Sequence, residues 1–340
     1  MSAPVRMAII GLGWWGQKMV SVLQGAGADI ELVRGVEPNL AAVQDFAVSK
    51  GLTVTADYAD ALADPMVEAV VLATPHDLHE DQIAAAVAAG KHIFCEKPLA
   101  LTRAGAARAV QACAQAGLQL GMGHERRWEP PIANLLARAD AGDLGRVQQI
   151  EANFSHDKFL SLDPSNWRLQ SNQAPAGGMT ATGIHLLDLS VRLLGAAAET
   201  TVHCETLSSN LPQGDTIAAF TRFANGGTSY VSASLANPFF SRFAVFGSLG
   251  WIDIRDKAHV ESPDGWVVTT GFKGQPITVT EVPKAEPVRD NLVDFARAIR
   301  AGGGYPVTGQ QMVDTIALLE AVFTSALSGR TETVGTGGTA

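Results

Sequence analysis

Three glycines near the amino terminus have the spacing of a phosphate-binding turn. The sequence MAIIGLGWWG places Gly11, Gly13 and Gly16 after an apolar run and before a segment that can be helical. Glycine lets the backbone approach a pyrophosphate, and the N–H groups and dipole of the following helix stabilise its charge. A lone GxGxxG also serves ordinary tight turns, but strand–turn–helix context favours a dinucleotide. Trp14 and Trp15 are interpreted as packing residues, one of which can border the cofactor.

Glu37 comes 21 residues after Gly16 and closes the next predicted strand, 30–36. A carboxylate there can accept both hydroxyls of the adenosine ribose, and its charge repels a 2′-phosphate. We therefore predict NAD, with NADP less favoured. Arg34 weakens this prediction unless its side chain points elsewhere. The alternative is a solvated carboxylate at the end of a strand.

The motif ATPHDLH, residues 73–79, follows another predicted strand. Open α/β sheets bind ligands at the carboxyl ends of their strands, so Thr74, Pro75 and His76 are predicted to line the nicotinamide ribose. His79 is better suited to capping or packing. Two histidines could suggest a metal, but no carboxylate or cysteine completes a ligand arrangement, so no metal is predicted.

The motif CEKP, residues 95–98, ends the next predicted strand. Glu96 and Lys97 are predicted to contact the cofactor in the same crevice. There the lysine can also hydrogen-bond a substrate hydroxyl and stabilise alkoxide character. A cis bond at Pro98 would fix the turn. The alternative is an exposed lysine before a loop.

Alternating β-branched and alanine-rich segments over 5–123 predict βαβ units that position these motifs. Six strands are expected, at 5–10, 30–36, 53–55, 69–74, 92–95 and 118–122. Gly90 is expected to end one helix in a left-handed cap, and Thr102 to begin the next as its N-cap. The fold class is thus α/β, with a doubly wound parallel sheet in a first domain, 1–124.

A second domain, 125–308, is predicted to be α+β. Consecutive strands over 202–282 predict an open, largely antiparallel sheet, with one face covered by a helix at 179–194. Segment 155–178 lacks a pattern and is interpreted as a lid. Helices are expected near 290–301 and over 309–328, the latter able to pack back on the first domain, with a frayed tail at 329–340.

Composition limits the partners. The net charge is -9 and the pI about 5.4, which argues against nucleic acid or an anionic membrane. The sequence shows neither a signal peptide nor an apolar run long enough for a membrane span, so a cytoplasmic protein is expected. The three cysteines form no CxxC pair and are expected to be reduced thiols.

The motifs GLGWWG, ATPHDLH, FCEKPLALT and GIHLLDL occur in the order typical of the glucose-fructose oxidoreductase, inositol dehydrogenase and rhizopine-catabolism (Gfo/Idh/MocA) family. The chain resembles this family over nearly its whole length, including the late segment FGSLGWIDI. The resemblance implies a Rossmann domain, a second domain whose open sheet often forms oligomer interfaces, and hydride transfer to or from a nicotinamide. A small-molecule substrate and a homodimer or homotetramer are expected.

The resemblance also implies catalytic residues. Carried over by motif, Lys97 and His185 flank the reacting carbon, and the imidazole can take the hydroxyl proton. The family usually has an aspartate four residues before this histidine, where this chain has Ala181. That departure puts the ordinary sugar or inositol pose in doubt. Thr182 offers a nearby hydroxyl, and Asp188 could orient the imidazole.

Other substrate contacts are expected near the domain junction and in the lid. Within GHERRWEP, residues 123–130, Arg127 is the main candidate, because an arginine fork suits carboxylates or dense hydroxyls. An ion pair at the domain interface is an equal alternative for Arg127. In the lid, Trp167 could pack against the C–H face of a sugar while Arg168 binds oxygen.

Three functions follow. The first is an NAD-dependent oxidoreductase acting on a secondary alcohol of a sugar, polyol or related cyclic molecule. The second is a glycosidase or lyase that oxidises its substrate transiently and retains NAD tightly. The third is a non-catalytic sensor of NAD and a ligand, which Ala181 keeps open and the retention of Lys97 and His185 opposes.

Overall fold

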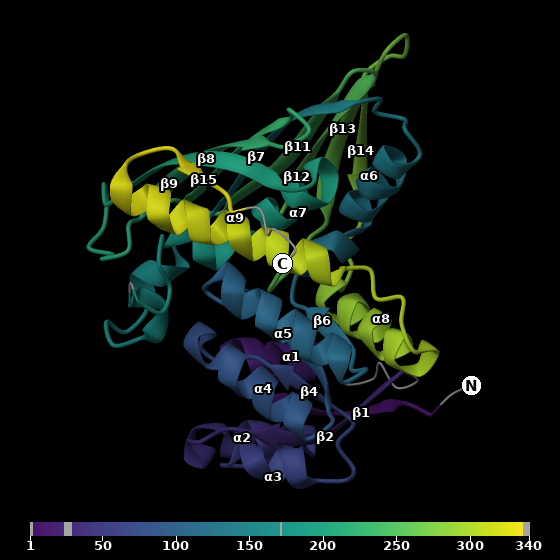
Figure 1. Ribbon diagram of the computed structural model, residues 1–340, viewed down its shortest axis with the longest axis vertical. Coiled ribbons are helices and arrows are strands. Elements are labelled where there is room, and N and C mark those ends of the chain that lie inside the picture. Colours follow the sequence, from purple (N-terminus) through teal and green to yellow (C-terminus); the bar gives the residue numbers. More distant parts are fainter. Residues whose placement is uncertain (1–2, 24–28, 171, 336–340) are drawn as a thin grey trace. The chain divides into compact units, whose positions relative to one another are not determined.

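The computed structural model describes residues 3–23, 29–170 and 172–335. The chain divides into two compact units, Met1–Glu125 with Glu286–Val313, and Arg126–Ala285 with Asp314–Ala340. This division differs from the predicted domains of 1–124 and 125–308, because residues 286–308 belong to the first unit. Each unit is described here by itself, with its elements labelled in Figure 1.

The first unit is built on a six-stranded parallel sheet, as predicted. The strand order is β3-β2-β1-β4-β5-β6. The chain thus extends the sheet in one direction from β1 to β3 and then crosses back, so that β4 lies on the other side of β1 and the order reverses between these two strands. Ligands bind at such a point, outside the carboxyl ends of the strands. The strands are β1 (Val5–Ile10), β2 (Ile30–Val36), β3 (Val54–Thr55), β4 (Ala69–Leu72), β5 (His92–Cys95) and β6 (Leu120–Met122).

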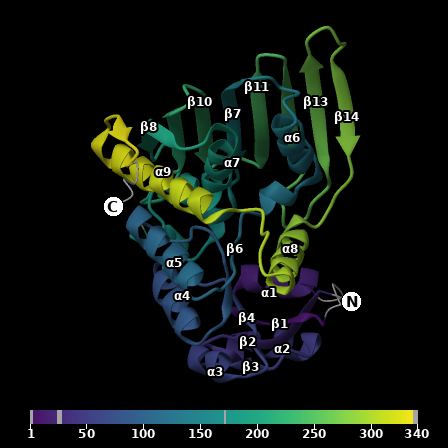
Figure 2. The same ribbon diagram turned by 45° about the vertical axis from the view of Figure 1, so that its right-hand side comes forward.

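Helices cover both faces of this sheet (Figure 2). The predicted N-cap Thr102 is confirmed, since its hydroxyl accepts from Gly105 N at 3.1 Å. Gly90 ends α4 with φ of 68°, also as predicted. The helices are α1 (Trp14–Leu23), α2 (Leu40–Lys50), α3 (Tyr58–Ala63), α4 (His79–Ala88), α5 (Arg103–Gln115) and α8 (Pro287–Ala301).

Helix α8 joins the first unit although it lies about 160 residues after β6 in the sequence. Phe295 packs edge-on against Phe94 of β5, with ring centroids 5.6 Å apart. Asn291 Nδ2 donates to Met122 O at 2.9 Å, and Tyr305 OH donates to Asn291 Oδ1 at 2.6 Å. These contacts bury one face of an amphipathic helix and anchor the end of β6.

The second unit is built on a nine-stranded sheet of order β14-β13-β12-β11-β7-β10-β9-β8-β15. Its neighbours are antiparallel except for β7 and β10, which confirms a largely antiparallel sheet. The strands are β7 (Val147–Ser155), β8 (Ala197–Glu205), β9 (Thr216–Phe223), β10 (Thr228–Ser234), β11 (Phe240–Gly247), β12 (Gly250–Asp256), β13 (Trp266–Phe272), β14 (Thr278–Val282) and β15 (Glu332–Thr333).

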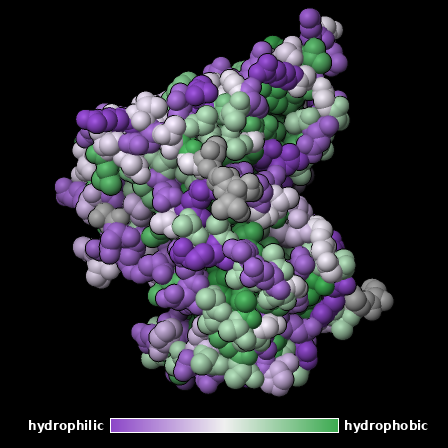
Figure 3. Space-filling view, in the orientation of Figure 1, coloured by the Kyte–Doolittle hydropathy of each residue, from purple (hydrophilic) through white to green (hydrophobic). Residues whose placement is uncertain are grey.

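Helices lie against one face of this sheet (Figures 1 and 2). They are α6 (Pro130–Asp140), α7 (Ile184–Leu194) and most of α9 (Gly309–Ser328), whose first turn belongs to the first unit. Ser325 Oγ of α9 accepts from Val202 N of β8 at 2.9 Å. On the side seen in Figure 3, hydrophilic and hydrophobic residues are interspersed over the surface.

Two parts of the second unit contain structure that sequence patterns did not indicate, and the interpretation of 155–178 as a lid stays a prediction. Segment 155–178 contains two short 3-10 helices, η3 (Lys158–Ser161) and η4 (Trp167–Leu169), and Leu169 is buried in a cluster with Leu211 and Leu235. Within the tail expected to be frayed, 329–340, residues Glu332–Thr333 form β15, which pairs with β8. Residues 336–340 of that tail lie outside the described part of the chain.

Candidate functional site

The glycine turn joins β1 to α1. Gly11 has φ of 90°, which side chains rarely adopt, and its N–H donates to Val36 O at 2.9 Å. A Cβ on Gly16 would lie 2.0 Å from Gly11 O, so the helix can start this close to the strand only with glycine. A Cβ on Gly13 would meet no atom of the described chain within 4 Å. Packing therefore does not require Gly13 to be glycine, and its backbone is open to a ligand.

Glu37 contacts this turn directly. Its Oε2 accepts from Leu12 N at 3.1 Å, and its Oε1 accepts from Asn39 N at 3.2 Å. Arg34, the residue that weakened the NAD prediction, forms an ion pair with Asp64 at 2.5 Å. The structure therefore brings the predicted ribose carboxylate to the glycine turn and engages the competing arginine elsewhere.

The loop after β4 lies against the same turn. A Cβ on Gly11 would be 2.7 Å from Ala73 O, and Ala73 N donates to Ile10 O at 2.8 Å. Thr74 Oγ1 hydrogen-bonds with Gln82 Oε1 at 2.5 Å. Pro75 precedes the short 3-10 helix η1 (His76–Leu78), in which His76 is buried. The predicted cofactor residues after β1 and β4 are thus neighbours.

His79 is fully buried at the start of α4. Its Nδ1 lies 2.7 Å from Pro98 O and its Nε2 lies 3.1 Å from Thr74 O. Burial lowers the pKa of this imidazole, against the opposing effect of the two carbonyl contacts. The expected packing role for His79 is confirmed, and the ring also connects two loops.

The CEKP motif follows β5. Lys97 is partly buried between two buried neighbours, and the Lys97–Pro98 bond is cis, as predicted. Glu96 N donates to Leu72 O at 2.9 Å, which ties the end of β5 to β4. A Cβ on Gly123 would lie 2.5 Å from Glu96 Oε2, so the Glu96 carboxylate packs over that backbone. Cofactor contact by Glu96 and Lys97 stays a prediction.

The two tryptophans of the turn differ in exposure. Trp14 is 46% exposed, whereas Trp15 is partly buried, and their rings meet edge-on at 5.3 Å between centroids. Among the described residues, the buried Nε1 of Trp15 has no hydrogen-bond partner. Trp14 is thus the one whose ring is accessible, and cofactor contact by either stays a prediction.

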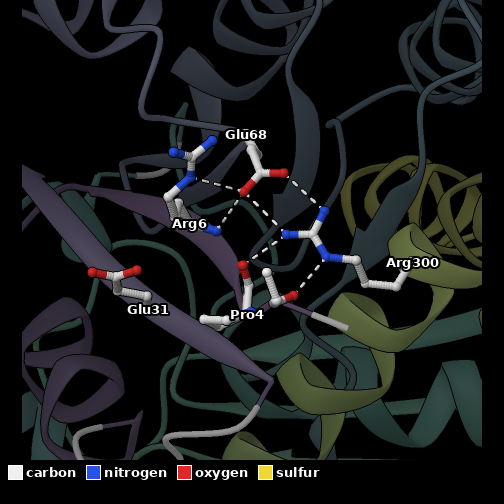
Figure 4. A pocket seen from close by; sticks show the side chains of 6 residues that line it. Pro4, Arg6, Glu31, Glu68 and Arg300 are labelled. Carbon is white, nitrogen blue, oxygen red and sulfur yellow. Dashed lines mark hydrogen bonds and ion pairs between the residues drawn. The ribbon is translucent and has the colours of Figure 1, made fainter. Parts of the chain in front are cut away.

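A pocket of the first unit lies at the opposite edge of the sheet, near the amino ends of β1, β2 and β4 (Figure 4). Glu68 lies there between two arginines, with Arg6 Nε at 3.0 Å and Arg300 Nη1 at 2.8 Å. Arg300 also donates to the carbonyls of Ala3 and Pro4. These contacts hold α8 to the sheet, so we assign this pocket a structural role.

In the second unit, His185 is the second residue of α7 and is buried. A π-helix, η5 (Met179–Gly183), precedes it, and such turns occur frequently at functional sites. Thr180 Oγ1 donates to Pro175 O, and Thr182 Oγ1 lies 2.8 Å from Phe154 O and 3.0 Å from Gly178 O. The buried Thr182 hydroxyl thus donates to the backbone, and substrate contact by Thr182 stays a prediction.

Ala181 lies one turn before His185 and is partly exposed. Its side chain packs, together with Phe159 and Leu162, against the cluster of Leu169, Leu211 and Leu235. The surroundings of this methyl group are therefore apolar. Segment 155–178 supplies most of these apolar neighbours. Sequence patterns did not indicate that this segment would pack against Ala181.

Arg127 forms a buried ion pair. Its Nε and Nη2 each lie 2.7 Å from a carboxylate oxygen of Asp188, and both side chains are almost completely buried. The alternative of an ion pair at a domain interface does not describe this contact, because both residues belong to the second unit. Substrate binding by Arg127 stays a prediction. Asp188, considered as an orienting partner for His185, is the carboxylate that neutralises Arg127.

Arg126 is buried in a similar way. Its guanidinium lies 2.8 Å from Ser241 Oγ, 2.9 Å from Asp256 Oδ2 and 3.2 Å from Glu129 Oε2. These partners come from β11, β12 and the residue before α6, so Arg126 anchors the residues that precede α6 to the sheet.

The predicted lid residues are held by contacts within segment 155–178 and by Gln213 outside it. The Arg168 guanidinium stacks over the Trp167 ring at 4.3 Å, and Asn166 Oδ1 accepts from Arg168 N at 3.0 Å. Gln213 Nε2 donates to Arg168 O at 2.8 Å. Both side chains are partly buried, and substrate binding by them stays a prediction.

Sequence reasoning missed a polar cluster that follows β7. Lys158 Nζ lies 2.5 Å from Glu261 Oε2 and 3.0 Å from His259 Nδ1, and the His156 ring is 5.6 Å from that of His259. These groups can donate and accept hydrogen bonds to an oxygen-rich ligand. About 100 residues separate His156 and Lys158 from His259 and Glu261, so no local pattern connects them. Only the polar HDK sequence after β7 could have indicated this cluster.

Across residues 3–23, 29–170 and 172–335, no group of three or more His, Cys, Asp or Glu side chains is arranged to hold a metal ion. Within the same residues, no helix has both the length and the apolar character needed to cross a membrane. Lys97 belongs to the first unit and His185 to the second, so their joint action rests on the resemblance.

Comparison with known proteins agrees with this organisation. Residues 5–124 match the model of the Gfo/Idh/MocA oxidoreductase family, NAD-binding Rossmann fold, and residues 132–253 match its C-terminal domain. The chain is 30% identical over 285 residues to the 1,5-anhydro-D-fructose reductase of Ensifer adhaerens, covering 81% of this chain and 82% of that protein.

It is also 26% identical over 337 residues to the inositol 2-dehydrogenase of Rhizobium meliloti, covering 96% and 98% of the two chains. The crystal structure of a putative NADPH-dependent oxidoreductase from Desulfitobacterium hafniense aligns with a TM-score of 0.89 and 24% identity, over 98% of this chain and 99% of that one. This structural likeness supports the fold alone.

Proposed function

The chain belongs to the Gfo/Idh/MocA family of NAD(P)-dependent oxidoreductases, and we propose that it uses NAD to oxidise a secondary alcohol of a sugar, polyol or related cyclic molecule. The observation that carries the proposal is the contact of Glu37 Oε2 with Leu12 N at 3.1 Å. It seats a carboxylate beside the glycine turn, where ribose hydroxyls can be recognised and a 2′-phosphate is repelled.

The first unit has the features that such a cofactor requires. The open space around the Gly13 backbone and the start of α1 fit a pyrophosphate, and Glu37 fits the adenosine ribose. Thr74, Pro75 and His76 would border the nicotinamide half. A bound nicotinamide supplies the acceptor for the hydride that leaves the alcohol carbon.

The residues of the chain then handle the proton and the charge on oxygen. His185 takes the hydroxyl proton on a ring nitrogen and returns it in the reverse direction. The Lys97 ammonium donates a hydrogen bond to the same oxygen and stabilises its alkoxide character.

A turnover screen of sugars, polyols, their acids and cyclic diols with NAD and NADP tests the proposal. Lys97→Ala and His185→Ala should each lower turnover by about 10²–10⁴-fold while NAD affinity stays within about threefold, because neither residue is assigned to the adenosine half. The exposed Lys273→Ala and His203→Ala serve as matched controls with unchanged turnover. Unchanged turnover in both active-site variants would contradict the roles of Lys97 and His185.

The same screen separates the other two functions. Product formation without net change in nicotinamide absorbance, with NAD retained through purification, would favour a glycosidase or lyase. Tight binding of NAD and a ligand without any product would favour a sensor.

Cofactor choice has its own test. The natural protein should prefer NAD, and Glu37→Ser should reduce the NAD/NADP preference by at least about tenfold, because it removes the charge that repels the 2′-phosphate. A preference of the natural protein for NADP would contradict the assignment to Glu37.

We propose that the protein works in the cytoplasm as a homodimer or homotetramer. The three cysteines, all within the described residues, are free thiols, which suits a reducing compartment.

Phe220 and Tyr230 are directly opposed on β9 and β10 and are 52% and 47% exposed. They alternate with residues buried under the helices, so they project from the open face of the sheet. Light scattering should show an oligomer that Tyr230→Lys weakens.

A further inference from the structure

His79 connects two loops that follow neighbouring strands of the first unit. The loop after β4 presents the carbonyl of Thr74, and the turn after β5 presents the carbonyl of Pro98. The His79 ring lies between them, with Nε2 at 3.1 Å from Thr74 O and Nδ1 at 2.7 Å from Pro98 O. The ring is completely buried, so solvent does not compete for either contact.

The chemistry of the two partners defines what the ring does. Carbonyl oxygens only accept hydrogen bonds, so the imidazole must donate. In its neutral form the ring has one N–H, so only one of the two contacts is a hydrogen bond. We assign that hydrogen bond to Pro98 O, whose contact is the shorter, and the Thr74 carbonyl then packs against the ring nitrogen that carries no proton. A buried polar ring is costly unless it is hydrogen-bonded, so an apolar side chain would serve better if the position only needed to be filled.

Pro98 comes directly after Lys97. A restraint on the Pro98 carbonyl therefore restrains the backbone that carries the Lys97 side chain. Glu96 N, on the other side of Lys97, is held by Leu72 O of β4 at 2.9 Å. The lysine thus lies between two fixed points, both of which connect β5 to the β4 side of the sheet.

We propose that His79 is a positioning residue that holds Lys97 in place through Pro98. The proposal rests on the proposed function for its kinetic consequence, since Lys97 is there the group that stabilises the alkoxide. The structural part does not depend on that function.

The structural part is tested by hydrogen–deuterium exchange on the protein without cofactor. His79→Phe keeps the ring and removes both contacts, and it should raise exchange of the amides in 96–101 by at least about tenfold. His79→Asn places an amide nitrogen near the position of Nδ1 and should restore protection. His92→Phe is the matched control, because its Nδ1 accepts from Gln119 N at 2.9 Å but lies at the other end of β5. Unchanged exchange in His79→Phe would overturn the proposal.

The kinetic part compares the change in kcat with the change in the Kd for NAD. In His79→Phe, kcat should fall by about 10- to 100-fold, as expected when a catalytic group is misplaced, while the Kd for NAD changes less than about threefold. His79→Asn should recover kcat to within about threefold. An unchanged kcat, or a loss of NAD affinity equal to the loss of kcat, would overturn the positioning role.

If His79→Phe does not fold, two polar variants test the positioning role of His79 instead. His79→Gln places its amide near Nε2 and keeps the Thr74 contact, whereas His79→Asn keeps the Pro98 contact. The proposal expects higher kcat and slower exchange in 96–101 for Asn than for Gln, and the reverse order would overturn it. If the natural protein oxidises no alcohol in the screen, the proposed function fails, but the exchange comparison still accepts or rejects the restraint by His79.

Discussion

Arg127 and Asp188 form a buried two-bond ion pair in the second unit, with both nitrogen–oxygen distances at 2.7 Å. Removing one partner leaves the other charge buried, so Arg127→Ala should lower the free energy of unfolding by about 3–5 kcal/mol. Arg127→Met with Asp188→Leu should recover most of that loss, because apolar residues can replace a buried pair. Urea unfolding followed by tryptophan fluorescence measures both.

The exposed pair of Arg222 and Glu199 provides the control for this experiment. Arg222→Ala should change the free energy of unfolding by less than about 1 kcal/mol, since surface ion pairs contribute little. Equal effects of Arg127→Ala and Arg222→Ala would contradict the structural role of Arg127. A rise in KM without loss of stability would support the predicted substrate binding.

Arg127 also illustrates what a sequence can predict. The glycine turn, Glu37 and the CEKP motif follow strands with strong local patterns, so their place at one edge of a parallel sheet could be predicted from chain order alone. The partner of Arg127 lies 61 residues away on a helix, and no local pattern indicates which carboxylate will meet it. The same holds for Lys158 and Glu261, and for α8, whose amphipathic pattern does not specify the unit it covers.

A substitution in the glycine turn can test cofactor binding without changing the packing of the folded protein. Gly13→Ala should leave the melting temperature within about 2 °C, because its Cβ would meet nothing within 4 Å. The variant should nevertheless weaken NAD binding by at least about tenfold, because the added methyl group would occupy the space for the pyrophosphate. Calorimetry and thermal unfolding measure the two effects.

Gly16→Ala is the contrasting variant. Its Cβ would lie 2.0 Å from Gly11 O, so both NAD affinity and stability should fall. If Gly13→Ala bound NAD as tightly as the natural protein, the turn would be structural and the dinucleotide site would lie elsewhere.

Glu68 predicts a dependence of stability on acid pH. Hydrogen bonds from Arg300, followed by those from Arg6, lower the pKa of its carboxyl from 4.5 to about 2, against the opposing effect of burial. Because the folded-state pKa is below the unfolded one, the stabilisation is complete above about pH 4.5 and is lost as the pH falls toward 2. The side chain is 27% exposed, so solvent screening reduces the contribution to about 1–2 kcal/mol.

Glu68→Gln should therefore be less stable than the natural protein at pH 7, and the difference should shrink between pH 4.5 and 3. Urea unfolding at several pH values measures it. Arg108→Gln, which removes an exposed ion pair with Glu80, is the control and should show little change at either pH. A constant difference across the range would show that Glu68 acts by packing rather than by charge.

Ala181 tests whether segment 155–178 is packed as described. Ala181→Asp places a carboxylate against Leu169, Leu211 and Leu235, so it should lower the free energy of unfolding by about 1–3 kcal/mol at pH 7. Burial raises the folded-state pKa of such a carboxyl, so part of the loss should be regained as protonation sets in near pH 4 to 5. Ala181→Asn, of the same size, should show no such recovery. If the segment were instead an open lid, the new carboxylate would be solvated, and both variants would change stability by less than about 0.5 kcal/mol at either pH.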